Sequence, residues 1–537
     1  MASEPELGSE FVAGSERPKK ATVRRNVASN YMVAVVIVIV GFITTPILTH
    51  QLGILRYGVW ALIGSLIPFL ELLELGFANA TIAFVSRHLE LEDDEKVDAT
   101  LNTSFLCLSV LGIIAFGGVV VFAIFLPHII TSIPPSLVGQ ARFLLLLLAF
   151  DMAVSIPMDT FGGALCALQR FDLLSYSLIA VVVSQAIGWI IVVEFHGGLI
   201  ALGVVSVVIS LAGQVSRLII VRRLLPWFHL SFRRFDRGLI RRFTSASGRY
   251  SIVQVADAMI GLSDVLIVGA AAGVPAAAVY AIAQRLGFLP LRITQPRTFL
   301  SFSQAGQLAA RENWSGLRES TDEVVRFVLY LSVPSAIALG FLAGPTVEAW
   351  VGPLYREAAS IIGLLCIAGV VQAWALAVRQ SLNGAGRPTL SAVLYGTEAV
   401  LHIVLGIVLA SRYGAIGMAE AALISVVLLE GMLMLPLGYR RLGDSFSRRA
   451  LRTVRTLGLP ALATGALAWV LGRGGGPLYT FVDGHGRIPG LIVVATAGIA
   501  LMAVFYPLLL ACLPSTERRR ALARTRVSLG RFAARLH

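Results

Sequence analysis

Long apolar runs separated by short polar stretches fill the chain from residue 30 to residue 512. Most of these runs reach the roughly 20 residues that a helix needs to cross a bilayer. The pattern predicts fourteen membrane-spanning segments, which lie near residues 30–50, 58–84, 101–126, 143–167, 172–195, 199–221, 250–271, 276–308, 324–343, 358–382, 390–410, 415–438, 457–472 and 489–512. We therefore expect an all-α polytopic membrane protein.

The polar stretches carry an asymmetric charge. With residues 1–29 as a cytoplasmic tail, alternate connections fall on opposite sides of the membrane, and 34 of the 44 lysines and arginines lie on the side of that tail. Six lie on the other side, and four fall within predicted segments. Because basic residues are enriched on the cytoplasmic side, we expect both termini to be cytoplasmic.

The composition excludes an ordinary soluble multidomain chain. Only 14% of the residues are charged and 56% are hydrophobic, whereas soluble domains contain about 25% charged residues. The net charge of +13 requires no nucleic-acid partner, since the basic loops face the anionic lipids of the inner leaflet. The four cysteines and eight histidines lack metal-ligand spacing, and the sequence contains no phosphate-binding loop for ATP. We expect neither a metal nor another cofactor.

An internal repeat divides the chain. The matched pieces are 52–60 with 272–280 at an offset of 220 positions, and 167–170 with 384–387 and 197–199 with 414–416 at an offset of 217. This repeat predicts two six-helix lobes of the same topology around a central cavity, an arrangement that suits alternating access. The predicted parts are a disordered cytoplasmic tail (1–29), an N-lobe (30–222), a basic cytoplasmic linker (223–249), a C-lobe (250–438), a basic cytoplasmic loop (439–456), a terminal helix pair (457–512) and a basic cytoplasmic tail (513–537).

Ionisable groups within the segments are candidates for the cavity wall, because a charge inside a bilayer is costly. Segment 276–308 carries Arg285 about 14 Å deep, at about 1.5 Å per residue. Arg292 lies seven residues later on nearly the same face, and Arg297 lies nearer the inner surface. Gln284 accompanies them. Guanidinium groups at such a wall would bind an anion, and would bind a phosphate in a bidentate manner.

Acidic groups lie on the preceding segment. Asp257 and Asp264 are seven residues apart, and Arg285 falls between them in depth, so an Arg–Asp network between the two segments is geometrically feasible. The network would either serve transport or only stabilise the fold. Arg379, near the inner end of segment 358–382, is a further candidate for substrate binding or for an interfacial position.

Segment 390–410 offers a second pair of ionisable groups. Glu398 and His402 are one helical turn apart, so they share a face. The pair would relay coupling protons or would simply be bonded to each other.

Several motifs are similar to those of Wzx-type polysaccharide flippases, which belong to the multidrug/oligosaccharidyl-lipid/polysaccharide flippase superfamily. The resemblance covers about residues 30–440, and its motifs are Gly53 with Tyr57-Gly58-Val59-Trp60, Leu73-Glu74-Leu75-Gly76-Phe77, Gln169-Arg170-Phe171-Asp172 and Asn383-Gly384-Ala385-Gly386-Arg387-Pro388. Residues 283–286 also resemble the lipid II flippases, in which an arginine lines the central cavity. The first two segments lack the cavity arginines of that subfamily, which favours the polysaccharide branch.

The resemblance implies that a polyprenyl-(pyro)phosphate-linked oligosaccharide is flipped from the inner to the outer leaflet of a bacterial plasma membrane. Arg285 and Arg292 would hold the pyrophosphate, and an ion gradient or the membrane potential would supply energy. Glycosyltransferases and a polysaccharide polymerase are the implied partners in surface polysaccharide assembly.

Other activities stay open. A lipid II flippase would share the same chemistry, whereas a multidrug or cation antiporter would need an acidic cavity. A membrane polymerase or glycosyltransferase would usually need an external domain, and the outer connections are short. A flippase-like scaffold without transport is the remaining alternative. We therefore expect a transporter rather than an enzyme.

Overall fold

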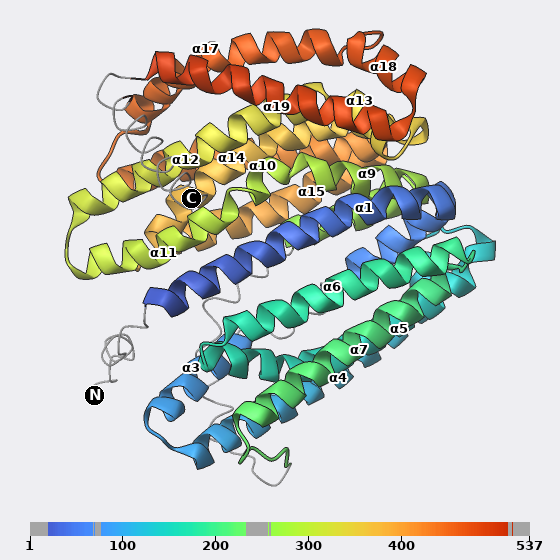
Figure 1. Ribbon diagram of the computed structural model, residues 1–537, viewed down its shortest axis with the longest axis vertical. Coiled ribbons are helices and arrows are strands. Elements are labelled where there is room, and N and C mark those ends of the chain that lie inside the picture. Colours follow the sequence, from blue (N-terminus) through green and yellow to red (C-terminus); the bar gives the residue numbers. More distant parts are fainter. Residues whose placement is uncertain are drawn as a thin grey trace, which may run out of the picture.

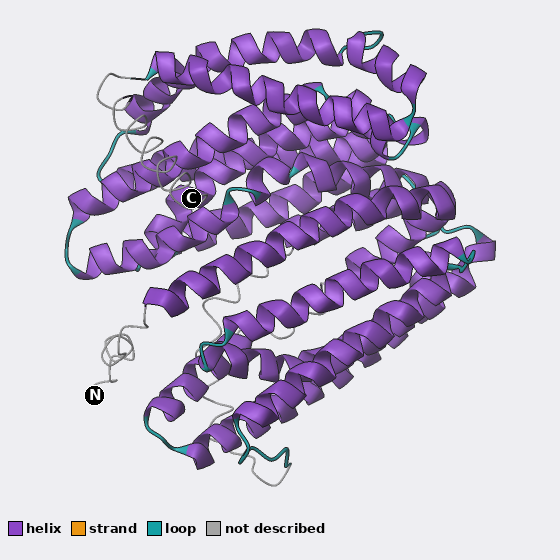
Figure 2. Cartoon of the chain, viewed as in Figure 1, coloured by secondary structure: helices purple, strands orange, loops and turns teal. Residues whose placement is uncertain are grey.

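Helices account for the whole of the fold that is described. The computed structural model describes residues 20–67, 77–231 and 259–513, together with Phe69, Ala256 and Arg518. Every regular element in these ranges is a helix (Figure 2), and eleven helical stretches among them are long and apolar enough to cross a membrane. The prediction of an all-α polytopic membrane protein is confirmed. Most of the predicted tails and of the predicted linker lies outside the described residues.

The helices fall into two successive halves followed by a terminal group. The first half contains α1 (Lys20–Leu66), α3 (Phe77–Glu90), α4 (Asp94–Ile129), α5 (Pro135–Ala167), α6 (Phe171–Glu194) and α7 (Leu199–Leu224). The second half contains a helix over Met259–Ala271, then α9 (Val274–Gly287), α10 (Leu289–Arg292), α11 (Gln295–Ala310), α12 (Trp314–Phe341), α13 (Ala343–Trp350), the 3₁₀ turn η3 (Pro353–Tyr355), α14 (Ala358–Gly384), α15 (Thr389–Ser425), the π-helix η4 (Val426–Met434) and α16 (Leu435–Arg441). The terminal group contains α17 (Phe446–Gly472), α18 (Pro477–His485) and α19 (Arg487–Cys512).

Two glycines explain why fewer continuous helices are observed than segments were predicted. Gly53 interrupts α1 with φ 69°, and Gly414 interrupts α15 with φ 65°. Positive φ is strained for residues with a side chain but accessible to glycine, so each glycine allows two predicted segments to follow one another without a loop. Prolines have the opposite effect in predicted segment 276–308, which they divide into α9, α10 and α11.

The turns of the two halves repeat at the offsets seen in the sequence. Before α4, Glu92 has φ 53° and Asp93 caps the helix, and before α12, 220 positions later, Glu312 has φ 52° and Asn313 caps the helix. Each capping side chain accepts a hydrogen bond from the N–H three residues on, which satisfies a free donor of the first turn. These two turns therefore repeat in their backbone conformation and capping as well as in their sequence offset.

The turn after α5 repeats after α14 at the second offset. Gln169 has φ 56° and Gly386 has φ 76°. In each case the next residue, Arg170 or Arg387, donates its backbone N–H to a carbonyl five residues back, at 2.8 Å and 3.0 Å. This is the hydrogen bond of a Schellman-type helix end. The limits of the lobes stay predictions, but the equivalence of these two turns is a property of the backbone.

The halves lie side by side with α1 between them (Figure 1). Helices α3 to α7 form one group, α9 to α16 form the other, and α17 to α19 cover the second half on its far side. α1 packs against both α6 and α9. One continuous core cluster contains residues of both halves, including Val59, Leu62, Val274 and Ala277.

Close contacts join the halves at the end that the charge pattern assigns to the outside. A Cβ atom on Gly58 would lie 2.4 Å from the carbonyl oxygen of Val274, so glycine permits this approach of the two backbones. Ser132 Oγ donates a hydrogen bond to the carbonyl oxygen of Gly269 at 2.7 Å. Because both contacts lie beside predicted outer connections, we expect the structure to represent a state that is closed toward the outside.

Candidate substrate and coupling site

Arg285 connects the two halves. It lies in the last turn of α9, and its Nη1 atom donates hydrogen bonds to Thr45 Oγ1 at 2.7 Å and to the carbonyl oxygen of Gly41 at 3.4 Å, both on α1. A Cβ atom on residue 41 would lie 3.3 Å from the same nitrogen, so glycine at this position leaves room for the guanidinium group. The Arg285 side chain is nevertheless exposed, which leaves it accessible to a ligand.

The two other arginines predicted on this segment follow Arg285 across the proline breaks. Arg292 is the last residue of α10 and is exposed. The positive charge of Arg285 repels the positive charge of Arg292. Arg297 lies in the first turn of α11 and is half-buried, and its Nη1 atom is buried without a hydrogen-bond partner within the described ranges. A buried donor without a partner is costly, so an anion bound there would stabilise this group.

A polar cluster around the buried Asp264 packs against α9. Asp264, which is 1% exposed, accepts hydrogen bonds from the hydroxyl of Tyr280 at 2.6 Å and from Gln284 Nε2 at 3.3 Å. Its Oδ1 atom lies 2.7 Å from His402 Nε2, and His402 Nδ1 lies 3.2 Å from Ser425 Oγ. The cluster therefore joins three helical stretches of the second half: 259–271, α9 and α15.

Asp264 and Arg285, between which the sequence made an ion pair geometrically feasible, are bonded to different partners. Tyr280 and Gln284 are one turn apart on α9 and both face Asp264. The next residue is rotated by about 100° around a helix of 3.6 residues per turn, so Arg285 faces α1 instead. Asp264 is bonded to His402, and the other predicted acidic partner, Asp257, lies outside the described residues.

Glu398 and His402 both lie on α15, and the described contacts give His402 two other partners. Both ring nitrogens of His402 are taken up by Asp264 and Ser425. Glu398 is fully buried on the same helix. His402 is thereby connected to another ionisable group, Asp264.

Arg379 lies away from the other arginines, inside the second half. Its Nη1 atom donates to Glu430 Oε1 at 2.6 Å, and the two residues are only 6% and 2% exposed. The guanidinium carbon lies 3.8 Å from the centroid of the Tyr395 ring. Glu430 belongs to the π-helix η4, so the pair joins α14 to an irregular turn. These contacts favour a structural role over the substrate-binding role predicted from the sequence.

Sequence reasoning missed the neutral members of the site. Thr45, Tyr280 and Ser425 carry no charge, and nothing in their spacing distinguishes them from ordinary helix residues.

Across the described ranges, no group of three or more His, Cys, Asp or Glu side chains could hold a metal ion.

Two helical halves, with eleven described helical stretches that are long and apolar enough to cross a membrane, define the class of a polytopic membrane protein. The family model described as "Polysaccharide biosynthesis protein" matches residues 23–298, just over half of the 537 residues. The chain therefore belongs to this family.

Relatives of known sequence or structure are distant. The chain is 19% identical over 396 residues to an uncharacterized membrane protein of Bacillus subtilis (strain 168), EpsK, a match that covers 72% of this chain and 76% of that protein. It is similar to the lipid II flippase MurJ in an inward closed conformation, with a TM-score of 0.69 and 14% identity over 90% of this chain and 97% of that one. An inward-facing multidrug resistance MATE family transporter of the MOP superfamily gives a TM-score of 0.67 and 14% identity over 77% and 98%. At such low identity these two likenesses show the fold alone.

Proposed function

We propose that the protein flips a polyprenyl-(pyro)phosphate-linked oligosaccharide from the inner to the outer leaflet of a bacterial plasma membrane for the assembly of a surface polysaccharide. The observation that carries this proposal is the position of Arg285, which is exposed and bonded from one half to the other. A pyrophosphate that binds this arginine would replace its contact with α1. Substrate binding and the separation of the halves would then be the same event, and no chemical step is involved.

The charge at the junction supports an anionic substrate. Arg285 and Arg292 are both exposed, and Arg297 adds a buried donor without a partner. Charge-assisted bidentate bonds from arginine to phosphate are roughly twice as strong as neutral hydrogen bonds, so pyrophosphate competes well with the hydroxyl of Thr45. The same charges would repel a cationic drug, which argues against a multidrug antiporter.

The polar cluster around Asp264 is our candidate for energy coupling. A carboxylate and an imidazole in hydrogen-bond contact are the groups from which proton relays are commonly built. His402 lies on α15, while Tyr280 and Gln284 connect Asp264 to the helix that carries Arg285. A change of protonation at this cluster would therefore act on α9 directly.

Flipping in proteoliposomes tests the substrate site. We expect Arg285→Ala to abolish translocation of a polyprenyl-pyrophosphate-linked glycan, and Arg285→Lys to restore part of it, because lysine keeps the charge without the bidentate geometry. Arg412→Ala is the matched control, since Arg412 is an exposed arginine of the same half in a predicted outer connection. Unchanged flipping by Arg285→Ala would refute the proposal.

The coupling cluster needs a separate assay. We expect His402→Asn and Asp264→Asn to remove the stimulation of flipping by a pH gradient while exchange down a substrate gradient continues. If both variants still respond fully to the pH gradient, the Asp264–His402 pair has no part in coupling.

A lipid II flippase is the second candidate, because its substrate also carries a polyprenyl pyrophosphate and the likeness to MurJ extends over 90% of this chain. The same proteoliposomes distinguish the two candidates when lipid II replaces the oligosaccharide carrier. Faster flipping of lipid II than of the oligosaccharide carrier would transfer the proposal to peptidoglycan synthesis.

A further inference from the structure

A polar seam runs between α5 and α7, inside the first half, where the two helices pack against each other. Asp151, Ser155 and Asp159 are spaced four residues apart on α5, so they share one face of that helix. On α7, Ser210 faces the Asp151 carboxylate, and Arg217 is bonded to Asp159 Oδ1 at 3.0 Å. These two contacts show that the polar faces of both helices meet along the seam.

Gln214 lies between the two contacts on α7. It follows Ser210 by four residues and precedes Arg217 by three, so it belongs to the same face and points toward α5. The residue is only 4% exposed, and its Oε1 atom is buried without a hydrogen-bond partner in the described part of the chain. A buried acceptor without a partner is costly, so a ligand bound beside this oxygen would stabilise it.

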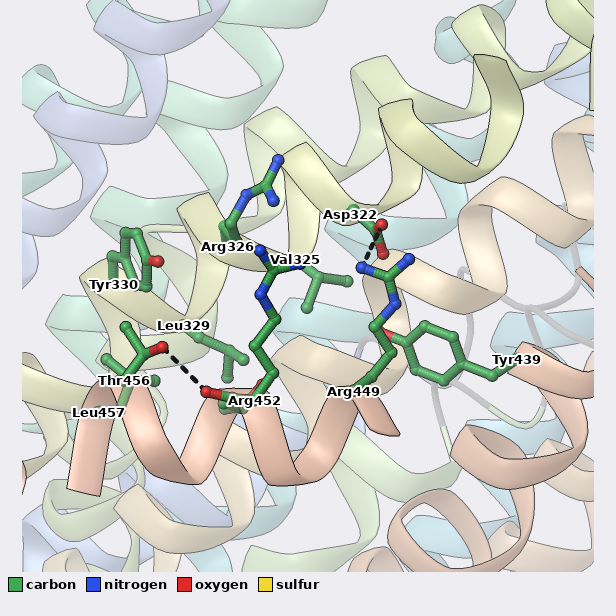
Figure 3. A pocket seen from close by; sticks show the side chains of 11 residues that line it. Asp322, Val325, Arg326, Leu329, Tyr330, Tyr439, Arg449, Arg452, Thr456 and Leu457 are labelled. Atoms are coloured by element: carbon green, nitrogen blue, oxygen red, sulfur yellow. Dashed lines mark hydrogen bonds and ion pairs between the residues drawn. The ribbon is translucent and has the colours of Figure 1, made fainter. Parts of the chain in front are cut away.

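Asp151 provides a second acceptor of this kind. It lies at the middle of the 33-residue helix α5, and its Oδ1 atom is also buried with no partner among the described residues. By contrast, Asp159 meets the guanidinium group of Arg217. In the second half, Asp322 of α12 meets Arg449 of α17 (Figure 3). No basic group of the described ranges acts on Asp151 in this way, so the seam contains one unbalanced negative charge.

The charge of the seam decides which ligand it suits. A water molecule could donate to both free oxygens, but it would leave the charge of Asp151 unbalanced inside the membrane, where an isolated charge is costly. A metal cation satisfies the oxygens and the charge together. Carboxylate, carbonyl and hydroxyl oxygens are the ligands that hard cations prefer, and one unpaired carboxylate matches one positive charge. These properties favour an alkali-metal cation over a divalent cation.

We propose that an alkali-metal cation, for which Na⁺ is the probe, binds between α5 and α7 to Asp151 Oδ1 and Gln214 Oε1. The hydroxyls of Ser155 and Ser210, each one turn from one of these residues, are further ligands. The ion would link two helices of the first half near the centre of the membrane. The site is separate from the polar cluster around Asp264 in the second half, and it does not depend on the substrate proposed above.

Thermal unfolding of the purified full-length protein tests this site. Tryptophan fluorescence is followed in detergent at pH 8 while NaCl replaces N-methylglucamine chloride at constant ionic strength. We expect Na⁺ to raise the melting temperature of the wild type. Asp151→Asn and Gln214→Leu should each raise the Na⁺ concentration of half-maximal effect at least about tenfold, which corresponds to about 1.4 kcal/mol.

Matched variants control for charge and for amide loss elsewhere in the first half. Glu194→Gln removes an exposed carboxylate at the end of α6, and Gln185→Leu removes an amide that donates to the Ser206 carbonyl oxygen at 3.4 Å. Both are expected to respond to Na⁺ like the wild type. Because Asp151→Asn removes the unbalanced charge, it should be at least as stable as the wild type without Na⁺, and less stable than the wild type when Na⁺ is present.

The outcomes distinguish this site from other sources of a sodium effect. Equal responses of Asp151→Asn and Glu194→Gln would overturn the proposal, because the effect would not come from the seam. A response that Asp264→Asn abolishes and Asp151→Asn retains would place the ion in the second half and would also overturn it, as would stabilisation of the wild type that follows pH but not Na⁺. Should Asp151→Asn and Gln214→Leu not fold, Ser210→Ala removes a single hydroxyl and is expected to weaken the response to Na⁺ several-fold. A normal response of Ser210→Ala would then overturn the proposal.

Discussion

The buried pair of Arg379 and Glu430 gives a quantitative test of how the second half is held together. In Arg379→Met, the Glu430 carboxylate keeps a site that is 2% exposed but loses the cation 2.6 Å away. Removing one partner of a buried ion pair costs about 3–5 kcal/mol, and the lost contact with the Tyr395 ring adds about 1–2 kcal/mol. We therefore expect a loss of about 5 kcal/mol for Arg379→Met. Glu430→Leu should cost about 3–4 kcal/mol, because it leaves the guanidinium over the ring.

The double variant behaves differently if this reasoning is correct. Arg379→Met/Glu430→Leu removes both charges together, and replacement of a buried pair by apolar residues of similar volume is often neutral or stabilising by about 1–4 kcal/mol. After the loss of the Tyr395 contact, we expect the double variant within about 2 kcal/mol of the wild type. Unfolding in mixed micelles with increasing dodecyl sulfate, measured on all four proteins, closes the double-mutant cycle with a coupling of at least about 3 kcal/mol.

One result would refute the energetic reasoning, and another would refute a purely structural role for the pair. If each single variant costs less than about 1 kcal/mol, as is common for a solvated pair, the site is hydrated and the burial argument fails. If the double variant is as stable as the wild type but no longer flips substrate, Arg379 acts in transport, as the sequence predicted, and its pairing with Glu430 is only one state of the arginine.

Three further predictions address the repeat, the packing and the topology. Gln169→Gly should stabilise the protein by up to about 1 kcal/mol and Gly386→Ala should destabilise it by about the same amount, because both positions have positive φ and a side chain there is strained; dodecyl sulfate unfolding of the two variants checks the signs. Gly384→Val should cost about 1–3 kcal/mol in the same assay, since even a Cβ atom would lie 2.1 Å from a backbone oxygen on α11. An impermeant maleimide on intact cells should label Leu354→Cys, exposed by 62%, but should leave Arg448→Cys unlabelled, and the opposite pattern would invert the topology.

The main helices were predictable because membrane spans leave a strong signal in hydropathy. The irregular elements were not. α13 and α18 contain only eight and nine residues, which is too short for a distinct apolar run, and the π-helix η4 differs from an α-helix only in its hydrogen bonds. The repeat shows the same limit. Matching glycines revealed the offsets of the repeat. The positive φ angles of Glu92 and Glu312 could not be predicted, because neither residue is a glycine.

The sequence was sufficient to pick out the charged residues of the candidate site, but not to predict which residue each of them is bonded to. Counting residues along a helix gives the depth of a charged group in the membrane to within one turn, and by this count Asp264 and Arg285 lie at similar depths. The partner of each depends on helix rotation, where a change of one residue means about 100°. Asp264 meets His402, 138 positions away in the sequence, and no local spacing connects the two residues.

Contacts within each half differ in kind from contacts between the halves, and this difference bears on how the halves move relative to each other. Among the described contacts, the ion pairs Asp159–Arg217 and Arg379–Glu430 and the hydrogen bond between Asp264 and His402 each join helices of the same half, and the ion pair Arg449–Asp322 joins α17 to α12. Across the junction, Arg285, Ser132 and Trp350 donate to neutral acceptors, the last to the Phe42 carbonyl at 2.8 Å.

A hydrogen bond between neutral groups contributes about 0.5–1.5 kcal/mol and one from a charged group about 1.5–3 kcal/mol. The bond from Arg285 to Thr45 and the bonds of Ser132 and Trp350 together contribute about 3–6 kcal/mol, to which the longer bond from Arg285 to the Gly41 carbonyl adds. Conformations that exchange readily differ by only a few kcal/mol. Ion pairs therefore lie within each half, whereas the described hydrogen bonds across the junction have neutral acceptors. A charged substrate can replace the bond of Arg285, while the apolar core shared by both halves keeps them together. This is the distribution that a protein needs if its halves rock as rigid bodies around a central site.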